Sequence, residues 1–142
     1  MKKLSLLFFL IITLVNPGCK KENDNDSSER LEGVWELRSA RSMLVSTYPP
    51  GNGHIISFTG NTYEVIDNGQ ITRSGEFQVV EDPGASESTC LNITAGQYTN
   101  RIIYDNNMTV TKTFFEIAEN KLTIISGCFA VDAGSSLEYE RR

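Results

Sequence analysis

Three cysteines and a single histidine are the residues in this sequence whose side chains could carry specific chemistry. A cysteine can be a buried thiol, one half of a disulfide or the attachment point of a modifying group, depending on its surroundings. His54 has no second imidazole to share a metal, and we expect it to be an exposed residue at a strand end. The spacing supports no Ser-His-Asp arrangement, so we expect no catalytic residues, no metal, no cofactor and no enzymatic activity.

The first eighteen residues predict a secretory signal peptide. Met1-Lys2-Lys3 is a short basic start, and residues 4–15 form an apolar run. Crossing a bilayer of about 30 Å takes roughly 20 residues, so this run is too short to span a membrane. Its length and its flanks match a signal peptide instead. A buried N-terminal helix is the alternative, and the two leading lysines argue against it.

The dipeptide Gly18-Cys19 resembles the lipobox of bacterial lipoproteins. In that family the cysteine becomes the first residue of the mature protein and carries acyl chains, palmitate among them. The resemblance implies that residues 1–18 are removed and that Cys19 is lipidated. Several acyl chains give durable attachment to a membrane. We therefore expect an anchor in the outer membrane of a Gram-negative cell envelope.

Residues 19–30 predict a disordered polar tether, because no apolar side chain follows Cys19 until Leu31. A cysteine followed by Lys20 and then by acidic residues also resembles the export signal of surface-exposed lipoproteins in some Gram-negative bacteria. The alternative is a plain solvated spacer, and the sequence leaves both interpretations open.

Cys90 and Cys128 lie in the part of the chain that we expect to be exported, where disulfides persist. If Cys19 is acylated, the remaining pair is even and fits one bridge. Such a bridge would close a loop of about 38 residues and stabilise the fold by roughly 3–4 kcal/mol. Two separately buried thiols are the alternative.

From Leu31 onward, short β-rich segments alternate with turn signals, as in an all-β domain. Asn68-Gly69 is a strong hairpin signal, and Gly75 suggests a bulge or a bend inside its strand. The nine candidate strands are residues 34–40, 54–59, 62–67, 70–81, 89–94, 99–105, 108–118, 121–126 and 136–142.

These hairpins predict one domain, residues 31–142, folded as an up-and-down antiparallel β-barrel of about eight strands. Closing the sheet removes the unpaired edges that invite aggregation. The interior of an eight-stranded barrel is filled by side chains or holds one small ligand. An open β-sandwich is the alternative architecture.

The segment Gly33-Val34-Trp35 resembles the Gly-x-Trp motif that opens the first strand of lipocalins. The chain ends in a segment similar to the closing strand of lipocalin-like bacterial lipoproteins. In lipocalins an arginine of the last strand packs over that tryptophan and closes the base of the barrel. The resemblance implies this role for Arg141, with Arg142 as the second candidate. It covers residues 31–142 and implies a lipocalin-like barrel.

Strand alternation would point a set of aromatic residues into the barrel, together with Ile56, Val65, Leu91 and Ile102. The connection 42–53 could form the mouth of a pocket, because long loops in compact domains are often binding loops. Core filling is the alternative role for the aromatics. The candidates for ligand binding are Trp35, Tyr48, Phe58, Tyr63, Phe77 and Tyr104.

These features favour a lipid-anchored barrel that binds a small apolar or amphipathic ligand. A protein-interaction module with a filled interior, acting through its loops on an envelope protein, is the rival hypothesis. An enzyme that uses a pair of carboxylates is a third. A cavity of a few hundred Å³ would favour the first, and a packed interior with an exposed apolar patch the second.

Charge adds a constraint on partners. The chain carries a net charge of -5 at neutral pH. Binding of nucleic acid depends on Lys and Arg neutralising phosphates, and electrostatic attraction to anionic lipid depends on the same residues. We therefore expect no nucleic-acid partner, and we expect membrane attachment to depend on the lipid on Cys19.

Overall fold

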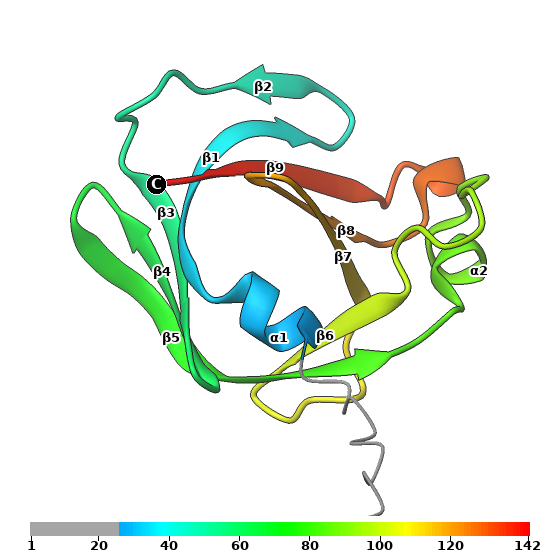
Figure 1. Ribbon diagram of the computed structural model, residues 1–142. Helices are drawn as coiled ribbons and strands as arrows, with labels where there is room; N and C mark the ends of the chain where they lie inside the picture. The colour runs from blue at the N-terminus through cyan, green and yellow to red at the C-terminus, as the bar shows by residue number, and fades with distance from the viewer. Residues whose placement is uncertain (1–25) are drawn as a thin grey trace, which may run out of the picture.

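The structure, a computed structural model, describes residues 26–142 (Figure 1). The predicted signal peptide, the lipidation site Cys19 and residues 20–25 of the tether lie outside the described residues. The elements are α1 (Asp26–Leu31), β1 (Gly33–Arg41), β2 (Val45–Thr47), β3 (His54–Thr59), β4 (Thr62–Asp67), β5 (Gln70–Glu81), α2 (Ala85–Thr89), β6 (Asn100–Tyr104), β7 (Thr113–Ala118), β8 (Lys121–Ser126), a 3-10 turn (Phe129–Val131) and β9 (Ser135–Arg141).

The strands form one antiparallel sheet that closes on itself. Its order is β2-β1-β3-β4-β5-β6-β7-β8-β9, and β1 also pairs with β9. The result is an up-and-down barrel of eight strands, with β2 as an extra strand alongside the end of β1. Figure 1 looks into this ring of strands and shows α1 lying across it. The predicted barrel is confirmed, and the chain does not adopt the open sandwich.

Turn chemistry explains why the hairpin predictions succeeded. The predicted strands 54–59, 62–67, 70–81 and 121–126 coincide with β3, β4, β5 and β8. Asn68 and Gly69 connect β4 to β5, and both have positive φ angles, of 50° and 82°. Two-residue hairpin turns require this backbone conformation, which Asn and Gly adopt at low cost.

Three strand predictions differ from the structure, one of them because the strand predicted at 108–118 begins only at Thr113 as β7. Residues 89–94 are not a strand: helix α2 ends at Thr89, and Cys90 then takes a left-handed conformation with φ of 57°. Conversely, β2 lies inside the connection 42–53, where no strand was expected. It is three residues long, and all three are exposed, so no alternation of buried and exposed residues marked it.

The predicted irregularity in β5 exists, but it lies at Thr72 rather than at Gly75. Val65 pairs with Arg73, whereas the next residue of β4, Ile66, pairs with Ile71, so Thr72 is the extra residue of a β-bulge. Gly75 serves a different purpose. A Cβ atom at Gly75 would collide with the carboxylate of Asp105 and lie 3.1 Å from the Tyr63 ring.

The folded domain begins earlier than the sequence predicted. Residues 26–30 were assigned to the disordered tether, but they form most of α1. Leu31, the last residue of α1, is fully buried, and its carbonyl accepts a 2.8 Å hydrogen bond from the indole nitrogen of Trp35. The short polar helix α1 is ordered because Leu31 packs in the core and the helix covers one end of the barrel.

A second apolar cluster lies on the outer face of the barrel. Phe114 of β7 and Ile125 of β8 are buried beneath Ala85 of α2. Leu91, which we expected inside the barrel, packs against this outer cluster instead. The other partly buried members are Ile93, Tyr98 and Phe129.

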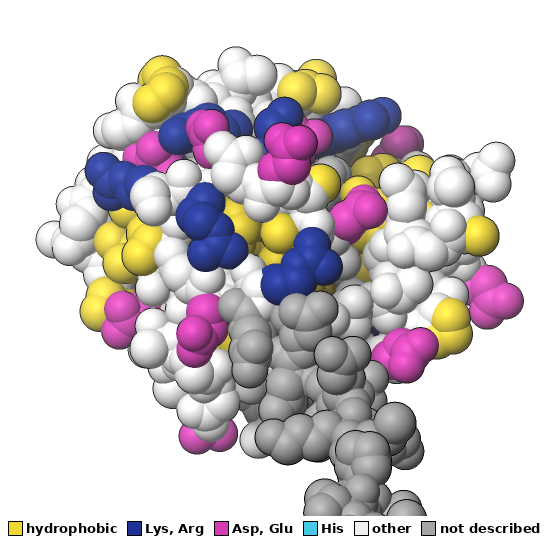
Figure 2. All heavy atoms as spheres, in the orientation of Figure 1, with side chains coloured by type: hydrophobic (Ala, Val, Ile, Leu, Met, Phe, Trp, Pro, Cys, Tyr) yellow, Lys and Arg dark blue, Asp and Glu magenta, His cyan; other side chains and the backbone are white. Residues whose placement is uncertain are grey.

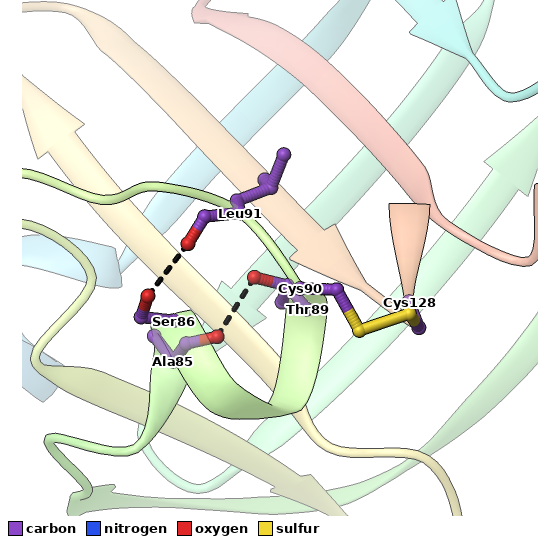
Figure 3. The surroundings of a disulfide bond; sticks show 6 residues. All are labelled: Ala85, Ser86, Thr89, Cys90, Leu91 and Cys128. Atoms are coloured by element: carbon purple, nitrogen blue, oxygen red, sulfur yellow. Dashed lines mark hydrogen bonds between the residues drawn. A yellow bond between two sulfur atoms is a disulfide. The ribbon is translucent and has the colours of Figure 1, made fainter. Parts of the chain in front are cut away.

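The disulfide between Cys90 and Cys128 holds this outer layer in place, as Figure 3 shows. It joins the end of α2 to the connection after β8, with the two Cα atoms 5.0 Å apart. Hydrogen bonds stiffen the same turn: the hydroxyl of Ser86 donates to the carbonyl of Leu91 at 2.6 Å, and that of Thr89 to Ala85 at 2.7 Å. The predicted pairing of these cysteines is confirmed.

Candidate functional site

One end of the barrel is packed solid. Leu31 and Trp35 are fully buried there, and the rings of Phe58 and Phe77 meet edge to face, with centroids 5.0 Å apart. Figure 2 views the molecule from the side of α1 and shows basic and acidic side chains around an apolar centre. The remaining buried members of this core include Phe115 and Leu122. This end of the barrel therefore holds a packed apolar core.

A cavity of about 420 Å³ lies toward the other end of the barrel. Ile124 of β8 lines this cavity, and it lies nearer than Leu122 to the end of the barrel opposite α1. Leu137 and Tyr139 of β9 also line it, and both lie nearer to that end than Arg141. The complete lining is Ile56, Tyr63, Val65, Thr72, Arg73, Tyr104, Thr113, Ile124, Ser126, Leu137 and Tyr139. A mostly apolar cavity with a few polar groups is the usual composition of a site for a small molecule.

The cavity adjoins a second hollow at the ends of β3 and β4. This second hollow, of about 420 Å³, shares Val65, Thr72 and Tyr139 with the first and also contacts His54 and Asp67. Nδ1 of His54 lies 2.9 Å from a carboxylate oxygen of Asp67. The second hollow therefore places this pair next to the cavity.

The bulge in β5 determines which side chains of that strand line the cavity. In a regular strand, consecutive residues face opposite sides of the sheet. Thr72 and Arg73 are consecutive, yet both line the cavity. The extra residue in the ladder accounts for this, because a bulge re-aims the neighbouring side chains. It leaves Arg73 opposite Val65, on the inward face of the sheet.

Arg73 belongs to a cluster with two tyrosines and an aspartate. Its guanidinium carbon lies 5.2 Å from the ring centroid of Tyr63 and 5.3 Å from that of Tyr104. The two rings contact each other edge to face at 4.7 Å. Asp105 accepts a 3.0 Å hydrogen bond from the Tyr63 hydroxyl and lies 3.4 Å from Arg73 Nη2. The cluster brings a cation and aromatic faces to the cavity wall.

The tyrosines of the cavity are held in the protonated form. Burial raises the pKa of Tyr139 to about 12. Burial also raises the pKa of Tyr104 well above its usual range, with a further contribution from Tyr139. Both phenols are therefore neutral hydrogen-bond donors at physiological pH. Both side chains are partly buried, and neither hydroxyl has a protein hydrogen-bond partner within the described residues.

Only part of the predicted ligand set meets at this cavity. Tyr63 and Tyr104 line it. Trp35, Phe58 and Phe77 are core residues of the packed end. The sequence reasoning missed Arg73 and Tyr139. Strict alternation back from Phe77 and from Arg141 would have placed both on the inward face.

Tyr48 lies outside the cavity, and its loop is not a lid. The Tyr48 ring packs edge to face on His54, with centroids 5.1 Å apart. The loop that follows is fixed to the outer face of β1. The backbone nitrogen of Gly51 donates to Glu36 at 3.0 Å, and Asn52 donates to the carbonyl of Leu37 at 2.8 Å.

Glu36 is a buried carboxylate that binds this loop through a hydrogen bond. One of its oxygens accepts hydrogen bonds from Gly51 and, at 2.7 Å, from Arg38. These two bonds, that of Gly51 first, lower the pKa of Glu36 from 4.5 to about 2. Arg38 also reaches Glu140 on β9 at 2.9 Å. The cluster lies on the outside of the barrel and has a structural role.

A groove of about 470 Å³ lies outside the barrel, between the β1–β2 hairpin and the disulfide-bonded layer. Ile125 and Ser136 form part of its wall. Next to it, the hairpin exposes 78% of Met43, 80% of Leu44 and 65% of Val45. This is the conspicuous apolar surface that an interaction module would use.

No group of three or more His, Cys, Asp or Glu side chains among residues 26–142 could hold a metal ion. No helix in that same range is both long enough and apolar enough to cross a membrane.

Comparison with known proteins found no match. No family model, no curated protein and no solved structure matches this chain. The site must therefore be interpreted from its own geometry.

Proposed function

We propose that this protein is a lipid-anchored lipoprotein of the bacterial envelope whose lipocalin-like barrel binds a small apolar or amphipathic molecule. The observation that carries the binding function is the cavity of about 420 Å³ in the barrel interior. An eight-stranded barrel can fill its interior with side chains, and this one does so at one end only. Ligand pockets typically measure about 300–1,000 Å³, so the cavity suits a small ligand.

The class of protein is supported by separate observations. Gly18-Cys19 after a signal-like segment supports lipidation at Cys19. Gly33 and Trp35 open the first barrel strand, and the guanidinium of Arg141 lies over the Trp35 ring. This is the arrangement that the resemblance to lipocalins implies. It supports the lipocalin-like part of the proposal together with the barrel itself.

Two neighbouring residues of β9 allow a test with a matched control. Leu137 lines the interior cavity, and Ser136 lines the outer groove. We expect decanol, a neutral single-chain probe, to bind the unacylated mature chain, residues 19–142, in a calorimetric titration. Leu137→Trp should abolish binding by filling the cavity, and Ser136→Trp should leave it unchanged. Thr113→Phe fills the same cavity from β7 if Leu137→Trp does not fold.

The opposite pattern would contradict the proposal. If Ser136→Trp blocks decanol and Leu137→Trp does not, the ligand occupies the outer groove. If no chain-like or ring-like apolar probe binds at all, the barrel does not serve as a binding site.

The lipid anchor needs its own test. We expect a palmitate analogue fed to the cells of origin to label the wild-type protein in the membrane fraction. Cys19→Ser should remove the label, whereas Cys90→Ser, in the disulfide, should retain it. Labelling that survives Cys19→Ser would refute attachment at this residue.

The outer groove supports a second candidate function, an interaction with another envelope protein. The observation that favours it is the exposed apolar triplet Met43-Leu44-Val45 beside the groove. Contiguous exposed apolar surface often marks an interaction site. Replacing Leu44 by Glu should then reduce crosslinking to a partner in intact cells without changing ligand binding in the barrel.

A further inference from the structure

We propose that the barrel binds an amphiphile with one negatively charged head group, and that Arg73 holds this head group at the cavity mouth. The inference rests on the proposed ligand-binding function. It adds the sign of the ligand's charge and its orientation, with the apolar end directed into the barrel.

The first argument is the position of Arg73. It is the one charged residue among the described residues that line the cavity. Its register partner Val65 lines the same cavity. An inward position in a barrel with a filled interior would carry an apolar side chain, because a charge buried without a partner is costly. The Arg73 side chain is 57% exposed, so it lies at the rim, where a head group would meet water.

The second argument is that the guanidinium is held in place before any ligand arrives. The rings of Tyr63 and Tyr104 both lie within about 6 Å of it, the range in which an aromatic face attracts a cation. A side chain that is already ordered loses little conformational freedom on binding, which favours affinity.

The third argument is that Arg73 has N–H donors left for a ligand. A guanidinium has five N–H donors. The one carboxylate within reach of Arg73 among the described residues is Asp105, at 3.4 Å, and the Tyr63 hydroxyl is a further hydrogen-bond partner. Charge-assisted bonds of this kind are usually about 2.7–2.9 Å long. Asp105 is itself already occupied by the Tyr63 hydroxyl and the backbone nitrogen of Glu76.

The fourth argument is the presence of neutral donors in the same wall. The phenols of Tyr104 and Tyr139 line the cavity and have no protein acceptor within the described residues. An anionic oxygen accepts hydrogen bonds and donates none, so it complements both phenols and Arg73 at once. Among the cavity-lining residues a cationic head group would meet these donors and the positive charge of Arg73. The nearby carboxylates are those of Asp105, already bonded to Tyr63 and Glu76, and of Asp67 in the adjoining hollow.

The cavity also limits the apolar part of the ligand. Ile56, Val65, Ile124 and Leu137 provide its apolar wall. A volume of about 420 Å³ is near the lower end of the usual range for ligand pockets. It therefore favours a single short chain or a small ring system over a lipid with two chains.

The alternative is that Arg73 serves only as a structural partner of Asp105. That pair is half exposed on both sides, and exposed ion pairs contribute little to stability. The two interpretations predict opposite effects of removing the aspartate charge. If the pair is structural, removing the Asp105 charge should lower the stability of the fold. If Arg73 binds a head group, the same change should raise the affinity for anions, because the competing carboxylate is gone.

The experiment compares three probes of equal chain length: decanoate, decanol and decylamine. Each is titrated calorimetrically into the unacylated mature chain, residues 19–142, at low salt. We expect decanoate to bind about tenfold more tightly than decanol, as one charge-assisted contact at a solvated rim would give, and decylamine to bind most weakly. The advantage of decanoate should shrink as salt is added, because salt screens exposed charges.

Three variants assign the effect to the residue. Arg73→Gln should weaken decanoate about tenfold, to the level of decanol, and leave decanol unchanged. Asp105→Asn should strengthen decanoate. Arg142→Gln removes the same charge from an exposed residue at the chain terminus and should change neither probe.

The failures are distinguishable. Equal affinities for decanoate and decanol in the wild type, or decanoate binding unaffected by Arg73→Gln, would overturn the head-group site. Decanol binding that Leu137→Trp abolishes would leave the ligand-binding function standing in that case. Absence of binding by all three probes would overturn both.

Discussion

The guanidinium of Arg141 lies 4.2 Å from the ring centroid of Trp35 and donates hydrogen bonds to two carbonyls of the segment that covers the barrel end. These bonds reach Glu32 at 2.6 Å and Arg30 at 2.7 Å. One side chain from the last strand thus joins the first strand to α1. The contact with the ring is a cation–π interaction.

The first prediction follows from these contacts. Arg141→Ala should lower the free energy of unfolding by about 2 kcal/mol, because it removes two charge-assisted hydrogen bonds and the contact with the ring. Arg141→Lys should recover little, because one ammonium cannot reproduce the fork of a guanidinium. Urea unfolding followed by Trp35 fluorescence measures the change. Arg142→Ala is the control and should stay within about 0.5 kcal/mol.

The second prediction concerns Gly33, which has a φ angle of 128°, and where an added Cβ would lie 2.6 Å from Nη1 of Arg141. Gly33→Ala should cost about 2 kcal/mol or more, combining backbone strain with displacement of the arginine. Gly96→Ala is the matched control, because Gly96 also has a positive φ but open space around its Cβ. A double variant, Gly33→Ala with Arg141→Ala, should cost less than the two single costs added together. Equal costs for Gly33→Ala and Gly96→Ala would contradict the steric argument.

The third prediction concerns the disulfide, whose cysteines are 38 residues apart in sequence. Reduction should lower the free energy of unfolding by roughly 3–4 kcal/mol, through the larger conformational freedom of the unfolded chain. Amide exchange should accelerate in residues 82–99 more than in β3 and β4, because the bond holds the outer layer rather than the barrel. An unfolding midpoint that reduction leaves unchanged would disprove this role.

The fourth prediction concerns pH. The pKa of Glu36 is lowered in the folded protein from 4.5 to about 2, chiefly by the bond from Gly51 and then by Arg38. A lowered folded-state pKa stabilises the fold above the unfolded value, and this contribution is lost as the pH falls from 4.5 toward 2. Glu36→Gln should therefore flatten the dependence of the unfolding free energy on pH across this window. Glu87→Gln, at an exposed position, is the comparison, and identical slopes in both variants would refute the assignment.

Local sequence patterns were sufficient for most of the barrel. The alternation in 54–59 and 62–67 and the Asn68-Gly69 turn specify a hairpin without help from distant residues. The inward direction of Tyr63, Phe77 and Tyr104 follows from the same alternation. The pattern failed at 89–94, where a disulfide and a left-handed residue, not strand pairing, hold the backbone.

The sequence by itself determined the order of the β3-β4-β5 and β7-β8-β9 hairpins, their turn positions and the even pair of cysteines, and it predicts lipidation at Cys19. Only the tertiary structure decided that the far end of the barrel is hollow, that Leu91 lies outside and that Arg73 lies at the depth of the cavity mouth, beside Tyr104. The physical reason is that strand alternation assigns a side chain to one face of a sheet but not to a depth along the barrel. Depth depends on bulges, on register between strands and on which side chains pack from opposite walls.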